Sequence, residues 1–90
     1  MQQRAIVRLT NAGGLHARPC HAIATAALRF QASLRVVHDG READAKSILE
    51  LMMLGVPPGA ELELIADGED AAELLSSVVA VVAARFGETD

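Results

Sequence analysis

The chain has almost no aromatic side chains from which a core could be built. Phe30 and Phe86 are its only aromatic residues in a length of 90, although hydrophobic residues make up 51% of the sequence. Charged residues account for 22%, which is typical of a globular chain and not of a disordered one. The core must therefore be packed from Ala, Val, Leu, Ile and Met. Residues 1–90 are expected to form a single domain, because a chain of this length leaves no room for a second core.

Alternation of apolar and polar residues predicts four short strands. The first lies within 4–10, and the glycine-rich segment 11–14 ends it. The others are predicted over 34–38, 41–45 and 61–66. Asp39 and Gly40 form a two-residue hairpin turn between the second and third strands, because both residues tolerate positive φ.

Three helices are predicted between and after these strands. The first covers 17–29, with Pro19 in the first turn, where its missing N–H costs nothing. Ser47 and Glu50 form a capping-box pattern at the start of a second helix, which ends at Gly55. The last helix is indicated by apolar residues at intervals of three and four, namely Ala71, Leu74, Leu75, Val78, Val82 and Phe86. The order β-α-β-β-α-β-α predicts an α+β fold, a mostly antiparallel sheet with helices on one face.

The charge distribution excludes some classes of partner. The net charge of -4 argues against binding to nucleic acid. Residues 1–45 carry +3 (six basic, three acidic) and residues 46–90 carry -7 (two basic, nine acidic), an asymmetry that a protein partner could recognise. The longest apolar run, 78–84, is far shorter than the ~20 residues of a membrane span, so no membrane insertion is expected. No signal peptide is visible, and Cys20 as the only cysteine fits a reducing compartment, so the cytoplasm is expected.

A histidine at a predicted helix start is the best candidate for chemistry. His16 follows two glycines and precedes the helix, whose free N–H groups and dipole attract anions such as phosphate. The dipole disfavours a cationic imidazole, so His16 is expected to be neutral and nucleophilic. Arg18 adds donors suited to a transferring phosphoryl group. The alternative is that His16 only caps the helix or lies exposed in the loop.

These residues resemble a known motif. Residues 14–19, Gly-Leu-His-Ala-Arg-Pro, resemble the active-site motif of the HPr family, the histidine-containing phosphocarriers of the bacterial phosphoenolpyruvate-dependent phosphotransferase system. Residues 45–48, followed by 51–55, are similar to that family's regulatory serine segment. The resemblance spans nearly the whole chain. It implies an open-faced β-sandwich of four antiparallel strands with three helices on one side.

The resemblance also implies a relay. Phosphorylated Enzyme I would pass a phosphoryl group to Nδ1 of His16, and His16 would pass it to the A domain or subunit of an enzyme II, as in sugar uptake. His16, Ala17 and Arg18 would bind the phosphoryl group, with His16 and Arg18 acting in the transfer. The protein would be a monomeric carrier with no cofactor and no turnover of its own. A serine kinase/phosphorylase would modify Ser47 and lower transfer from Enzyme I.

The second helix is predicted to carry a docking surface. Four apolar residues over 51–54 cannot all face the core from two helical turns, so part of this segment should be exposed. Leu49 and Met52 are the residues expected to bind several partners in turn. Glu50 departs from the small residues common at its position, and its charge would oppose a phosphate on Ser47.

A different class of function stays open beside the carrier. Residues 43–54 are also similar to nitrogen-related paralogues, and a purely regulatory module could bind partners through Leu49 and Met52 with His16 unused. Cys20 and His21 lack the regular spacing of metal ligands, so no metal site is expected. Cys20 is expected to be partly buried in the helix.

Overall fold

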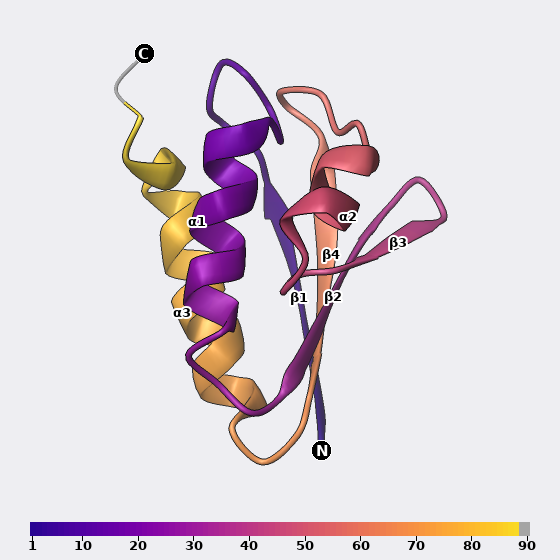
Figure 1. Cartoon of the computed structure of the whole chain (residues 1–90), viewed down its shortest axis with the longest axis vertical. Coiled ribbons are helices and arrows are strands. Elements are labelled where there is room, and N and C mark those ends of the chain that lie inside the picture. Colours follow the sequence, from indigo (N-terminus) through magenta and orange to yellow (C-terminus); the bar gives the residue numbers. More distant parts are fainter. Residues whose placement is uncertain (89–90) are drawn as a thin grey trace.

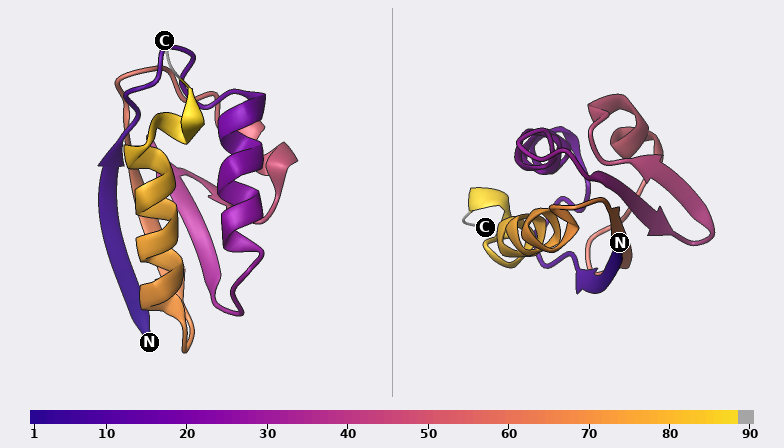
Figure 2. Two further views of the ribbon diagram at one scale, coloured as in Figure 1. Left: turned by 90° about the vertical axis from the view of Figure 1, so that its left-hand side faces the viewer. Right: turned by 90° about the horizontal axis from the view of Figure 1, so that it is seen from below.

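A computed structural model of the chain describes residues 1–88 (Figure 1). Its strands are β1 (Gln2–Arg8), β2 (Ser33–His38), β3 (Arg41–Asp44) and β4 (Glu61–Asp67). Its helices are α1 (Ala17–Ala27), α2 (Ile48–Met53) and α3 (Ala71–Ala83). The strands form one antiparallel sheet in the order β1-β4-β2-β3, and the helices cover one face of it (Figure 2). The predicted α+β fold and its order of elements are confirmed.

The register of the sheet separates a packed face from an open one. Leu64 of β4 pairs with Ala5 on one side and Val36 on the other, and this row faces the helices. The next row, in which Ile6 pairs with Glu63, belongs to the open face, and Ile6 is 70% exposed there. Period-two alternation therefore predicts correctly which side chains enter the core.

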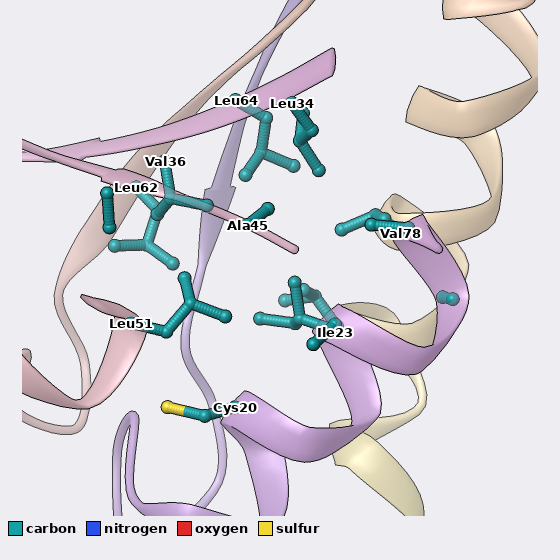
Figure 3. Close-up of a cluster of buried hydrophobic side chains, with 14 of the residues drawn as sticks. Cys20, Ile23, Leu34, Val36, Ala45, Leu51, Leu62, Leu64 and Val78 are labelled. Carbon is teal, nitrogen blue, oxygen red and sulfur yellow. The ribbon is translucent and has the colours of Figure 1, made fainter. Parts of the chain in front are cut away.

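The core between sheet and helices is aliphatic, as the composition requires. Figure 3 shows side chains from both layers meeting in it: Cys20, Ile23, Leu34, Val36, Ala45, Leu51, Leu62, Leu64 and Val78. Phe86 lies at its edge and is 8% exposed. The hairpin turn is also as predicted, with φ of 52° at Asp39 and 77° at Gly40. None of the helices in residues 1–88 is long and apolar enough to cross a membrane.

Two helices end earlier than predicted. The first was predicted to reach Arg29, but α1 stops at Ala27 and the chain tightens into i→i−3 bonds before it enters β2. The last was predicted to run on through Phe86, but α3 stops at Ala83. A short 3₁₀ turn follows, in which Arg85 and Phe86 adopt positive φ of 56° and 58°. Phe86 reaches the core through this left-handed turn and not through helical periodicity.

Candidate functional site

The loop before α1 is held against the segment that follows α2. Leu15 donates its N–H to the Val56 carbonyl at 3.0 Å, and its side chain is buried. Gly14 has a φ of 65°, and a Cβ there would lie 2.6 Å from the Val56 oxygen. Only glycine fits this backbone and this approach. The start of α1 is thereby fixed beside the end of α2.

His16 occupies the N-cap position of α1 but does not cap it with its side chain. Its backbone is extended, and the imidazole makes no capping hydrogen bond, so the alternative that His16 only caps the helix does not hold. The side chain is 45% exposed. A Cβ on Gly13 would lie 2.5 Å from Cδ2 of His16 and 2.7 Å from Nε2, so the ring rests in the space that Gly13 leaves.

The residues that follow His16 at the helix start have free hydrogen-bond donors. The N–H groups of Ala17 and Arg18 donate to no residue within 1–88, and Pro19 has no N–H to offer. The Arg18 side chain is exposed and makes no hydrogen bond or ion pair with the described residues. These groups are the donors that an anion at the positive end of α1 would use.

A carboxylate that the sequence motifs did not reveal also contacts His16. Oε2 of Glu88 lies 2.9 Å from Nε2 of the imidazole, and the Glu88 side chain is only 9% exposed. Its other oxygen, Oε1, accepts a hydrogen bond of 3.1 Å from Nδ2 of Asn11, which also donates to the Gly14 carbonyl. No sequence signal links these residues, because the tail that carries Glu88 reaches the site only after α3 has packed.

Two other candidate metal ligands lie near His16 in the sequence, Cys20 and His21. Cys20 is fully buried, deeper than expected, and burial raises the pKa of its thiol to about 11. Its Sγ lies 3.6 Å from the Leu15 carbonyl oxygen. His21 is exposed. Within residues 1–88, no three His, Cys, Asp or Glu side chains gather to hold a metal ion.

Ser47 caps α2, although the reciprocal half of the predicted capping box is absent. Its Oγ accepts the Glu50 N–H at 3.2 Å. The Glu50 carboxylate accepts the Asp44 N–H at 2.9 Å, and the Ser47 N–H donates instead to the Asp44 carbonyl. Glu50 therefore stabilises the turn before the helix and not the cap itself.

Helix α2 exposes apolar side chains beside the site. Leu51 and Leu54 are buried, whereas Leu49 is 68% exposed and Met52 46%. The predicted division of this segment is confirmed. The exposed apolar residues of α2 are here called the α2 patch, and they are Ile48, Leu49, Met52 and Met53.

Comparison with known proteins assigns this arrangement to a family. Residues 3–84 match the family described as the PTS HPr component phosphorylation site. The phosphocarrier protein HPr of Treponema pallidum is 38% identical over 91% of this chain and 93% of its own. The HPr-like protein Crh of Bacillus subtilis is 43% identical over 91% of this chain and 94% of its own.

Solved structures agree with the sequence comparisons. The crystal structure of HPr-C-His from Thermoanaerobacter tengcongensis superposes with a TM-score of 0.93 and 33% identity, covering 98% of this chain and 99% of that one. The chain belongs to the HPr family, the phosphocarriers of the phosphotransferase system.

Proposed function

We propose that the protein carries phosphoryl groups on Nδ1 of His16, taking them from phosphorylated Enzyme I and giving them to the A domain or subunit of an enzyme II. The observation that carries the proposal is the half-exposed imidazole at the start of α1, beside the free N–H groups of Ala17 and Arg18. Nδ1 makes no hydrogen bond with any residue in 1–88, so its lone pair is available to phosphorus.

The roles of the neighbouring groups follow from charge. During transfer, negative charge spreads over the three phosphoryl oxygens, and donors placed there stabilise it. The N–H groups of Ala17 and Arg18 are fixed donors, and the Arg18 guanidinium is a mobile one. The α2 patch, which lies next to the site loop, is proposed as the surface on which Enzyme I and the acceptor dock in turn.

The proposal also covers the regulation of the protein, its oligomeric state and its location in the cell. A kinase/phosphorylase would act on Ser47 at the start of α2, where a helix N-terminus tolerates added negative charge. The protein would work as a monomer of one domain over residues 1–90, in the cytoplasm, where a lone thiol stays reduced. It has no turnover of its own, because each phosphoryl group taken up must leave to a second protein.

The test uses purified protein, Enzyme I and labelled phosphoenolpyruvate. The parent chain is expected to gain an acid-labile, base-stable label, as a phosphohistidine would. His16→Ala should gain none, whereas the matched variant His21→Ala should be labelled like the parent. Arg18→Ala should still be labelled but about tenfold or more slowly, the effect of losing one charge-assisted contact. Label retained on His16→Ala would overturn the assignment.

A second candidate is a module that regulates by binding and does not carry phosphoryl groups. The 43% identity to an HPr-like protein, Crh, together with the exposed α2 patch, favours it. In that case the parent chain would stay unlabelled in the same assay, while Leu49→Asp would still weaken binding to its partner.

A further inference from the structure

We infer that Glu88 is a positioning residue, which holds the imidazole of His16 by Nε2 so that Nδ1 is the nitrogen that attacks phosphorus. This inference rests on the proposed carrier function. It concerns a residue beyond 3–84, the part of the chain that matches the family.

The contact itself determines which nitrogen carries the proton. An ionised carboxylate can only accept hydrogen bonds, so the 2.9 Å contact between Oε2 of Glu88 and Nε2 of His16 requires a hydrogen on Nε2. In a neutral imidazole the other nitrogen then has a free lone pair. Because Glu88 lies on the Nε2 side of the ring, Nδ1 is left to face a partner.

The carboxylate is held on its other side as well. Oε1 of Glu88 accepts from Nδ2 of Asn11, and the same Nδ2 donates to the Gly14 carbonyl, which fixes the orientation of this amide. Asn11 is 1% exposed, and its Oδ1 is buried with no hydrogen-bond partner among residues 1–88. A buried oxygen without a partner costs free energy. The Asn11 amide is nevertheless held in the orientation that directs its hydrogens to Glu88.

The tail is built to bring Glu88 to this position. After α3, Arg85 and Phe86 adopt left-handed backbone conformations that are uncommon outside glycine. This turn buries Phe86. The tail that follows α3 lies near the start of α1 (Figure 2). The Phe86 side chain therefore anchors the segment from which Glu88 reaches His16.

The contact assists one step of the transfer. The Nδ1 lone pair forms a bond to phosphorus while the bond from phosphorus to the donor's leaving atom breaks, and its electron pair stays on that atom. The ring becomes more positive as this happens, and the proton on Nε2 stays hydrogen-bonded to the Glu88 carboxylate, which offsets the new charge. Transfer to the acceptor reverses these changes.

The experiment compares Glu88→Ala and Glu88→Gln with the parent and with Glu69→Gln, an exposed carboxylate whose loss is the matched control. In glutamine an NH₂ group replaces one carboxylate oxygen, so the two separate acceptor atoms that face His16 and Asn11 in the parent are no longer both present. Two quantities are measured: the rate of labelling by Enzyme I and phosphoenolpyruvate, and the NMR signal of the His16 ring N–H. The parent and Glu69→Gln should show an exchange-protected proton on Nε2. Both Glu88 variants should lose this protection and be labelled about tenfold more slowly.

Two results would overturn the inference while the carrier function stands. They are unchanged labelling in Glu88→Ala, and faster labelling, which would mean that the carboxylate obstructs the site. If the parent chain itself takes up no label, the carrier function fails and Glu88 has no transfer to assist. The ring N–H signal would then still report the contact, so the two failures are distinguishable.

Discussion

At the scale of single residues, burial decides which of the reactive side chains near the site is inert. Cys20 lies one helical turn beyond His16, yet it is fully buried and its thiol contacts only the Leu15 carbonyl among polar groups in 1–88. Burial disfavours the thiolate, which is the reactive form of cysteine. Of these two side chains, the imidazole of His16 is therefore the one that is accessible to a reagent or partner.

Burial of Cys20 makes stability fall with rising pH. Its pKa is raised from 9.0 to about 11 in the folded chain, so above pH 9 the unfolded chain loses the proton first. Stability is then complete below pH 9 and should fall by roughly 2 to 3 kcal/mol as the pH rises through 11. The chain has no Tyr, and Lys46 is its only lysine, so few other groups titrate in this window.

Urea unfolding followed by far-UV circular dichroism at pH 8, 9.5 and 11 measures this fall. Cys20→Ala is the control, because it has no thiol to titrate. The stability that it loses through the cavity left in the core is the same at every pH. If the free energy of unfolding changed equally with pH in the parent and in Cys20→Ala, the prediction would be contradicted.

At the scale of elements, α2 combines a capped start with an apolar surface. The helix has only six residues, Ile48–Met53, and such a short helix depends on its caps and on the burial of Leu51. Its remaining apolar side chains face outward beside the loop that carries His16. The proposed docking surface and the proposed modification site therefore lie on the same short helix.

Ser47 should show a structural role and a regulatory role in different variants. Ser47→Ala removes the acceptor for the Glu50 N–H and should lower the free energy of unfolding by about 1 kcal/mol. Ser47→Asp keeps an acceptor at the N-cap, so its stability should stay near that of the parent. Its added charge beside the α2 patch should nevertheless slow the labelling of His16 by Enzyme I. If Ser47→Asp and Ser47→Ala are labelled at the same rate, Ser47 is a cap only.

The α2 patch should weaken partner binding when it is made polar. Leu49→Asp and Met52→Asp should each raise the Kd for Enzyme I about tenfold, because exposed apolar side chains at the centre of an interface contribute much of its free energy. Leu28→Asp is the matched control, since Leu28 is 63% exposed at the opposite end of α1 from His16. Titration calorimetry measures the affinities, and circular dichroism checks the folds. Equal Kd values for Leu49→Asp and Leu28→Asp would remove the patch from docking.

At the scale of the whole molecule, one carboxylate holds together two loops that are far apart in the sequence. Asp70, just before α3, accepts the N–H groups of Gln31 at 2.9 Å and Ala32 at 2.8 Å in the connection between α1 and β2. Both bonds stabilise the ionised form and lower the pKa of Asp70 below 3.8. This contact holds together the ends of the helical layer that lie farthest from His16.

Asp70 should therefore contribute to loss of stability in acid. Its contribution is complete above pH 3.8 and disappears as the pH falls through the lowered pKa of the folded chain. Asp70→Asn should have a lower Tm than the parent at pH 7 and a smaller further drop below pH 4. Asp39→Asn is the control, because asparagine suits the same hairpin turn. A parent-like Tm for Asp70→Asn at pH 7 would contradict this role.

Much of this molecule could be predicted from local patterns in the sequence. Period-two alternation, helical spacing and the Asp39-Gly40 turn are properties of neighbouring residues, and they led to the correct order of elements and to an aliphatic core. His16 and the helix with Pro19 in its first turn likewise belong to one short segment, and from this segment the sequence predicts an anion-binding helix start.

Contacts between distant segments were decided only by the tertiary structure. The apolar spacing continues through Phe86, yet α3 ends at Ala83, because Phe86 enters the core from a left-handed turn. That turn brings Glu88 to Nε2 of His16 and to the buried amide of Asn11. Sequence patterns describe the preferences of adjacent residues, whereas these contacts form only when the two ends of the chain pack on the same sheet.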